Sequence, residues 1–131
     1  MEDNFKLEII SPEIIVFSDE VKIVTLPSYE GDMGILKNHI SIITFLRPGI
    51  IKVQKNDGSF EEFFVQDGTV EYFNDNLVVL SASAINVKGL SKEFVNNLNK
   101  DTKDKLTVKN ITDHDRYILN HKLDALKEIR V

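Results

Sequence analysis

The residues that could support acid–base chemistry gather in one short segment, residues 29–39. This segment carries carboxylates at Glu30 and Asp32, an imidazole at His39, and glycines at Gly31 and Gly34. A carboxylate or a histidine acts as a general acid or base where a cleft brings it to a nucleophile. A spacing of two in extended chain would place Glu30 and Asp32 side by side on one face. The alternative is that these two carboxylates keep a turn soluble.

The rest of the chain offers little else for catalysis. It contains no phosphate-binding G-x-x-x-x-G-K-[ST] loop, no G-x-S-x-G elbow, no H-E-x-x-H pair and no cysteine. His114 and His121 are seven residues apart, whereas helical metal ligands are usually three or four apart. We therefore expect a protein without catalytic centre, metal or cofactor, in which the segment 29–39 is shaped to present something other than an active site.

Composition and charge narrow the class of protein. A chain of 131 residues is long enough for one compact domain with an appendage. No apolar run approaches the ~20 residues that span a bilayer, and the acidic N-terminus lacks a signal-peptide core, so we expect a cytoplasmic protein. Residues 1–87 hold 6 basic and 14 acidic side chains, whereas residues 88–131 hold 10 basic and 7 acidic ones. The acidic main part argues against binding of nucleic acid, and the asymmetry suggests different partners for the two parts.

The elements that must position the segment 29–39 are strands. Short β-branched or alternating apolar runs follow one another through the first two thirds of the chain, separated by turn signals such as Asn56-Asp57-Gly58. Pro27 is expected to end the run before the segment 29–39. This spacing predicts an antiparallel β-sandwich or barrel over residues 1–87. The expected strands cover residues 5–10, 14–17, 21–26, 40–46, 49–55, 60–66, 69–73 and 77–81.

The pattern changes to helical spacing over residues 88–131. Ser91 is expected to be the N-cap, and Leu90, Phe94, Leu98 and Leu106, with Val95 beside them, mark one face of a first helix. After an interruption at residues 108–110, Thr112 and Asp115 resemble a capping box that starts a second helix. The second helix carries a broad apolar stripe from Ile118 to Ile129. We expect an antiparallel two-helix hairpin that docks on the β domain or on another protein, because such a hairpin is marginal alone.

Several ordered motifs resemble the epsilon subunit of bacterial F-type ATP synthase. The stretch 27–39 contains the core Glu-Gly-Asp-Met-Gly-Ile-Leu-x-Asn-His, and residues 7–18 are similar to the opening strands of that family. Leu46-Arg-Pro-Gly-Ile-Ile is similar to the strand that follows the histidine segment. Phe64-Val-Gln-Asp-Gly-Thr-Val-Glu-Tyr resembles a Gly-Gly-centred turn, with Asp67 in place of the first glycine. The resemblance covers nearly the whole β part and implies an N-terminal β-sandwich with a C-terminal helical hairpin.

The resemblance implies a non-catalytic subunit of the central stalk. The β-sandwich would dock on the gamma subunit and touch the polar loops of the c-ring, and so couple proton-driven rotation to ATP synthesis in the alpha/beta catalytic head. The complex would lie at the cytoplasmic face of the bacterial inner membrane, with this chain peripheral and not inserted. The residues expected to face the c-ring are Glu30, Gly31, Asp32, Met33, Gly34 and His39.

In this family the C-terminal hairpin acts as a brake on ATP hydrolysis by extending along gamma into the catalytic head. The candidates for regulatory contacts with acidic surfaces of the head are Lys122, Lys127 and Arg130. Some members bind ATP through an [IL]-D-x-x-R-A motif at the first helix. The corresponding stretch here starts at Leu90 and has Ser91 for the aspartate and Phe94 for the arginine, which predicts no ATP site.

Two other classes compete with this interpretation. The first is an unrelated β-sandwich module for protein–protein interaction, which the ordered motifs disfavour. The second is a small β-barrel enzyme such as a cupin, which would need clustered histidines and carboxylates as metal ligands. The three histidines, His39, His114 and His121, are scattered along the chain.

Overall fold

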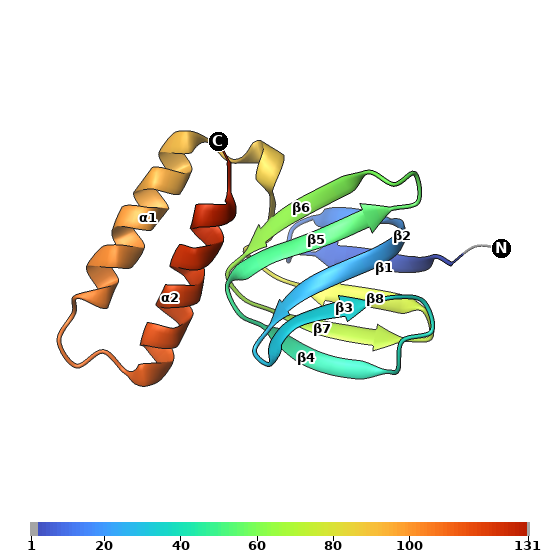
Figure 1. Cartoon of the computed structure of the whole chain (residues 1–131), viewed down its shortest axis with the longest axis horizontal. Coiled ribbons are helices and arrows are strands. Elements are labelled where there is room, and N and C mark those ends of the chain that lie inside the picture. Colours follow the sequence, from blue (N-terminus) through green and yellow to red (C-terminus); the bar gives the residue numbers. More distant parts are fainter. Residues whose placement is uncertain (1–2, 131) are drawn as a thin grey trace.

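The computed structural model describes residues 3–130, which form an antiparallel β-sandwich followed by a two-helix hairpin (Figure 1). The predicted fold class is therefore confirmed. The strands are β1 Phe5–Ile10, β2 Ile15–Ser28, β3 Gly31–Ile35, β4 Ile42–Leu46, β5 Gly49–Lys55, β6 Phe60–Val65, β7 Gly68–Phe73, β8 Asn76–Leu80 and β9 Ile85–Asn86. The helices are the 3-10 turn η1 Val87–Gly89, α1 Lys92–Leu106 and α2 Asp113–Glu128.

The strands pair in the order β1-β8-β7-β4-β2-β5-β6-β9, with β3 added to β2. Strand β1 also pairs with the first half of β2, so hydrogen bonding continues from one layer of the sandwich into the other. All pairs are antiparallel except β1 with β8, which run parallel. The long strand β2 thus joins the two layers and carries the β2–β3 turn at its far end.

Side chains that point inward at alternate positions along the strands form the main hydrophobic core between the layers. Phe5, Leu7 and Ile9 of β1 are buried, while the residues between them are only partly covered. On β7 the same alternation buries Val70 and Tyr72, and the Tyr72 ring meets Phe5 edge-on at 5.7 Å. Burial of such side chains contributes about 1.5–3 kcal/mol each and is the main force that holds the sandwich together.

Two strand expectations were wrong in their boundaries. The runs 14–17 and 21–26 form the single strand β2, which continues through Pro27 to Ser28. Pro27 is tolerated because it faces Asp32 of β3 in the ladder and its carbonyl accepts a hydrogen bond from the Arg47 backbone N–H at 2.9 Å. The segment 31–35, taken as loop, is strand β3, and the two-residue strand β9 was not expected.

The helical hairpin starts and ends at the predicted caps. Ser91 Oγ accepts from the Phe94 backbone N–H at 3.0 Å, and Thr112 Oγ1 accepts from the Asp115 N–H at 3.0 Å. Asn110, in the loop between the helices, has a φ of 65°, a left-handed angle that asparagine tolerates better than most residues. These local signals explain why the helix boundaries are readable from sequence.

The buried face of α1 agrees with the expected one at Leu90, Val95 and Leu98 but not at Phe94. Val95 and Thr102 are buried, whereas Phe94 is 38% exposed. The Thr102 hydroxyl satisfies itself within the helix by donating to the Leu98 carbonyl at 2.7 Å. The buried side of α1 is the one that faces α2, because α1 packs on α2 and α2 in turn lies against the sandwich (Figure 1). A second apolar cluster is buried here, formed by Ile50, Phe64, Leu90, Val95, Ala125, Leu126 and Ile129.

Candidate docking surfaces

The β2–β3 turn is built around a buried serine. Ser28 is fully buried, and its hydroxyl donates to the Gly31 carbonyl at 2.6 Å and accepts from the Glu30 N–H at 3.2 Å. Gly31 has a φ of 116°, which a residue with a side chain adopts only under strain. This geometry leaves the side chains of Tyr29, Glu30 and Asp32 exposed at the end of the hairpin.

The six residues expected to face the c-ring lie in three different places. Glu30, Gly31 and Asp32 lie together at the turn, and Gly34 follows on the exposed side of β3. Met33 points the other way and packs against the main core. His39 lies beyond the opposite end of β3, so the structure does not bring it together with the carboxylates at the turn.

His39 is part of a network that fixes the β3–β4 connection. Its Nδ1 donates to the Ile40 carbonyl at 2.7 Å, and its ring meets Tyr72 edge-on at 5.6 Å. Asp75 accepts from the Asn38 N–H at 2.9 Å and from the Tyr72 hydroxyl at 2.8 Å. Burial, followed by the Asp75 carboxylate, raises the pKa of Tyr72 to about 12, while the Asn38 and Tyr72 hydrogen bonds lower the pKa of Asp75. The arrangement stabilises the loop.

The hairpin meets the sandwich through a polar and aromatic contact as well as through the second apolar cluster. Arg47 donates to the Tyr117 hydroxyl at 3.2 Å and forms an ion pair of 3.5 Å with Asp32. Tyr29 stacks on Tyr117 and on His114, with ring centroids 5.8 and 6.3 Å apart. We call Tyr29, Asp32, Arg47 and Tyr117 the turn–hairpin contact.

A polar cavity of about 240 Å³ lies beside this contact, between the sandwich and α2. Its charged and titratable walls are Asp32, Arg47, Lys52, His121, Asp124 and Glu128. Lys52 and Glu128 form an exposed ion pair of 3.6 Å across the interface. Burial, followed by the charge of Arg47, lowers the pKa of His121, against the opposing carboxylates of Asp124 and Asp32. Within residues 3–130 no group of His, Asp and Glu side chains is arranged to hold a metal ion.

The three basic residues expected to make regulatory contacts lie in different environments. Lys127 and Arg130 are exposed on and after the last turn of α2. Lys122 is only 8% exposed. Burial, followed by the nearby charge of Lys105, lowers the pKa of Lys122, and Asp101 partly opposes this effect. In this docked hairpin only Lys127 and Arg130 are open to a partner.

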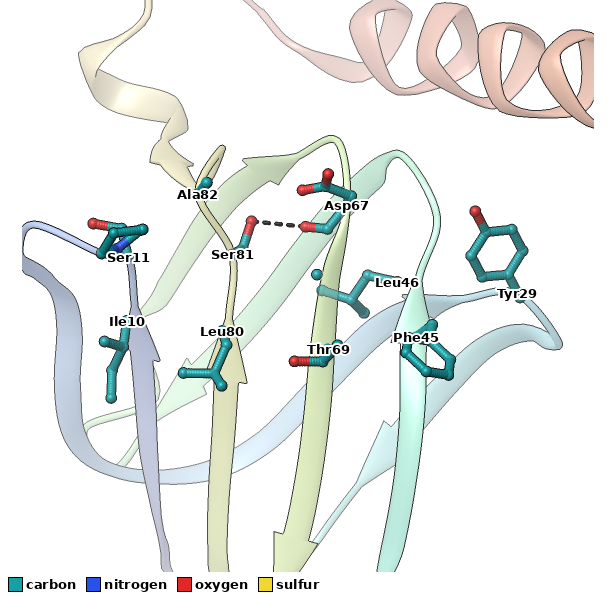
Figure 2. A pocket seen from close by; sticks show the side chains of 12 residues that line it. Ile10, Ser11, Tyr29, Phe45, Leu46, Asp67, Thr69, Leu80, Ser81 and Ala82 are labelled. Atoms are coloured by element: carbon teal, nitrogen blue, oxygen red, sulfur yellow. Dashed lines mark hydrogen bonds between the residues drawn. The ribbon is translucent and has the colours of Figure 1, made fainter.

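A second candidate surface lies on the outer side of the layer formed by β1, β8, β7 and β4. The pairing places Phe45, Thr69, Leu80 and Ile10 in one row across these strands, and Ile43 and Val78 in the next. Ile43 and Phe45 are 74% and 58% exposed. Figure 2 shows the first row at the rim of an open hollow. The hollow has a volume of about 840 Å³. At its edge Ser81 Oγ donates to the Asp67 carbonyl at 2.7 Å. We call Ile10, Ile43, Phe45, Val78 and Leu80 the outer apolar face.

Sequence comparison decides which family has these features. Residues 4–87 match the family described as ATP synthase, Delta/Epsilon chain, beta-sandwich domain. The chain is 42% identical over 130 residues to the ATP synthase epsilon chain of Pelagibacter ubique, covering 98% of this chain and 99% of that one. The chain belongs to the ATP synthase epsilon-chain family. The epsilon chain of Parvibaculum lavamentivorans is 34% identical over 131 residues, covering 99% and 98% of the two chains.

Solved structures share the epsilon-chain fold at low sequence identity. A chain of the Euglena gracilis mitochondrial ATP synthase, in a structure of OSCP, F1 and the c-ring, aligns with a TM-score of 0.78 at 16% identity, covering 98% of this chain and 82% of that one. A chain from the central stalk and c-ring of the Tetrahymena thermophila mitochondrial ATP synthase gives a TM-score of 0.58 at 12% identity, covering 94% and 93%. These likenesses confirm that sandwich and hairpin together form one known architecture.

Sequence reasoning missed the residues that join the two parts of this epsilon-family chain. Arg47 stood inside a matching motif, but nothing in its neighbours indicated a contact with Tyr117, 70 residues later. Tyr29 and Tyr117 carried no signal beyond their amphipathic side chains, which favour positions where one end is packed and the other hydrogen-bonded. The helices described within residues 3–130 are too short or too polar to cross a membrane.

Proposed function

We propose that the chain is the non-catalytic epsilon subunit in the central stalk of a bacterial F-type ATP synthase and helps to couple proton-driven c-ring rotation to ATP synthesis. The observation that carries the proposal is the 42% identity to an ATP synthase epsilon chain over 98% of this chain. The two structural neighbours, which come from ATP synthase assemblies that contain the c-ring, support it. On this proposal the chain is peripheral, at the cytoplasmic face of the inner membrane, and does not insert.

The gamma subunit docks on the outer apolar face. Its exposed apolar side chains come from neighbouring strands, and clustered exposure of this kind marks interaction surfaces more often than free surface. Aromatic anchors such as Phe45 commonly contribute most of the binding energy at such interfaces. Phe45 and Leu80 border the hollow seen in Figure 2, which offers room for a side chain of the partner.

The test is co-elution with a gamma-containing catalytic complex in size-exclusion chromatography. Phe45→Asp should weaken binding about tenfold or more, because burial of such a ring contributes about 1.5–3 kcal/mol and a buried unpaired charge adds a cost. Phe60→Asp is the matched control, since Phe60 is similarly exposed at 64% but starts β6, in the other layer. Failure of the unchanged chain to co-elute refutes the central-stalk proposal. Equal losses for both variants refute the assigned face.

The β2–β3 turn faces the polar loops of the c-ring. Glu30 and Asp32 are exposed there, and the geometry set by Ser28 and Gly31 holds them in place. Exposed carboxylates can pair with basic or amide groups, a contact that sets register more than affinity. Gly34 belongs to the same surface, whereas Met33 and His39 support it from the core and from the far end of β3. Glu30→Cys should cross-link to a cysteine in a c-ring loop, and Asp57→Cys, in the β5–β6 turn, should not.

The helical hairpin, residues 88–131, restrains ATP hydrolysis when it leaves the sandwich, residues 1–87. Lys127 and Arg130 are open to acidic partners already in the docked state, while Lys122 becomes available only when the helices separate. Truncation after Val87 should raise the ATPase activity of the complex. Unchanged hydrolysis rejects the brake without affecting the gamma assignment.

The chain regulates without a nucleotide site of its own. Ser91, at the position of the family's aspartate, is used as the N-cap of α1, and Phe94 replaces the arginine that would hold a phosphate. Calorimetric titration of the isolated chain with ATP at millimolar concentration should give no binding heat. Saturable binding would refute this part of the proposal.

A further inference from the structure

Arg47 is the one residue of the turn–hairpin contact that touches both the exposed turn and the hairpin by charge and hydrogen bonds. It lies between β4 and β5, where its backbone N–H donates to the Pro27 carbonyl at 2.9 Å. One guanidinium nitrogen donates to the Tyr117 hydroxyl at 3.2 Å, and the other lies 3.5 Å from Asp32. The Arg47 side chain is only 18% exposed, so water competes little for its guanidinium.

Tyr117 also contacts the β2–β3 turn directly, through Tyr29. Its hydroxyl donates to the Tyr29 carbonyl at 3.3 Å, and its ring stacks on the Tyr29 ring. Tyr29 is one of the two residues at the tip of the β2–β3 turn, and Asp32 is the second residue of β3. The hairpin is therefore held on the turn itself, in addition to its apolar contact with Ile50 and Phe64.

The Arg47 guanidinium couples the position of Asp32 to that of Tyr117. It is planar with its donors in a fixed fork, so holding one nitrogen at Asp32 orients the second nitrogen toward Tyr117. The Asp32 side chain is 72% exposed and can accept a bond from a group outside the chain. A cationic or donor group that binds the Asp32 carboxylate competes with Arg47 for it and weakens the contact that orients the guanidinium.

We propose that Arg47 makes docking of the hairpin depend on the occupancy of Asp32. A basic or amide group on a c-ring loop that binds Asp32 competes with Arg47 and loosens the hairpin. The identity of this competing group rests on the c-ring contact proposed above, whereas the link from Asp32 through Arg47 to the hairpin does not. The β2–β3 turn, which contacts the c-ring on this proposal, then also determines how readily the hairpin leaves the sandwich.

The link can be measured in the full chain alone. The protein has no native cysteine, so Ala125→Cys places a single thiol on the face of α2 that the sandwich covers, at 2% exposure. The rate of its reaction with a thiol reagent reports opening of the hairpin. Val79→Cys, in the main core at 0% exposure, reports unfolding of the sandwich and serves as the control probe.

Asp32→Asn should raise the Ala125→Cys reaction rate about two- to fivefold, the range of one exposed ion pair, and leave the Val79→Cys rate unchanged. Arg47→Gln should raise the Ala125→Cys reaction rate more, because the contacts with Asp32 and with the Tyr117 hydroxyl are both lost. In the Arg47→Gln background, Asp32→Asn should add nothing. Glu128→Gln breaks the comparable Lys52 ion pair and should have the same effect with or without Arg47.

An Asp32→Asn effect of equal size in both backgrounds, or no effect at all, overturns the link. The competition is tested with the gamma-bound complex, comparing Ala125→Cys labelling with and without the c-ring. Faster labelling with the c-ring supports it, and equal labelling overturns it. Absence of the Glu30→Cys cross-link refutes the c-ring contact itself, so the two failures are distinguishable.

Discussion

Tyr117 stacks on Tyr29 across the boundary between the helical hairpin and the β-sandwich, with ring planes inclined by only 14°. The two residues are 88 positions apart in sequence, and the Tyr117 hydroxyl donates to the Tyr29 carbonyl. The docked hairpin is thus fixed at two places along α2, by this aromatic pair and by the apolar cluster around Ala125 and Leu126. Only the aromatic pair adjoins the exposed turn.

Tyr117→Phe should loosen the docked hairpin less than Tyr117→Ala does. The phenylalanine loses hydrogen bonds worth about 1 kcal/mol but keeps the stacked ring, whereas alanine also loses an aromatic contact of about 0.5–1.5 kcal/mol and its buried area. Hydrogen exchange of α2 peptides, followed by mass spectrometry, measures the difference. Equal exchange in both variants would show that the ring contributes nothing to docking.

Docking of the hairpin should weaken in acid because of His121. In the docked state burial, followed by the charge of Arg47, lowers the pKa of His121. In a released hairpin the imidazole is exposed and has the ordinary histidine pKa of about 6.5. The released state therefore binds a proton more readily, so this contribution to docking is fully present above that pH and is lost as the pH falls below it. Asp124 and Asp32 oppose the shift, and Tyr117, Lys52 and Glu128 also border the site.

Thiol accessibility of Ala125→Cys, corrected for the intrinsic reactivity of the reagent across about pH 5 to 8, gives the docking equilibrium directly. His121→Gln is the control, since glutamine keeps a polar side chain but has no titration in this range. Its profile should be flatter than that of the unchanged chain. A docking equilibrium that strengthens in acid would contradict the assigned cause.

Lys122→Met should stabilise the docked hairpin. Burial of the Lys122 side chain, followed by the nearby charge of Lys105, lowers the pKa of its ammonium, and methionine fills similar space without a charge. A gain of about 0.5–2 kcal/mol is expected in thermal or denaturant unfolding. Lys127→Met is the exposed control and should change stability little. A loss of stability in Lys122→Met would show that attraction to Asp101 outweighs the cost of burial.

The sequence predicted the elements whose signals are local. The turn at residues 56–58 joins β5 and β6 as expected, and Ser91 and Thr112 cap the two helices. Pro27 was misjudged because its effect depends on position: a residue without an N–H is tolerated in a ladder when its carbonyl is used elsewhere. Phe94 and Val95 were both expected on the packed face, because spacing alone cannot tell which of two adjacent apolar positions faces the partner helix.

The candidate surfaces were less predictable than the fold. The resemblance indicated the turn at Glu30 and Asp32, but periodicity could not show that the Asp32 carboxylate pairs with Arg47 in the β4–β5 turn. The outer apolar face was also hidden, because Phe45 and Leu46 are equally apolar and only the pairing of β4 with β7 decides which points outward. Long-range pairing therefore supplies what local patterns lack.

Gly49→Ala should destabilise the sandwich and loosen the hairpin together. A Cβ at Gly49 would lie 2.4 Å from Cβ and 2.8 Å from Cγ of Pro27, far closer than non-bonded carbons approach. The proline ring cannot turn away, so β2 must shift from the start of β5, at a cost of about 1–3 kcal/mol. The same shift disturbs the Pro27 carbonyl that holds the Arg47 backbone, and through it the contact with Tyr117.

Gly34→Ala is the matched control for this strain, since a Cβ there meets nothing within 4 Å and the backbone angle of Gly34 is not in the left-handed region. Urea unfolding should therefore separate the two variants, with Gly34→Ala close to the unchanged chain. The Ala125→Cys thiol should react faster in Gly49→Ala than in Gly34→Ala. If Gly49→Ala lowers the free energy of unfolding but leaves thiol accessibility unchanged, the Pro27–Arg47 contact does not position the hairpin, and docking depends on the apolar cluster alone.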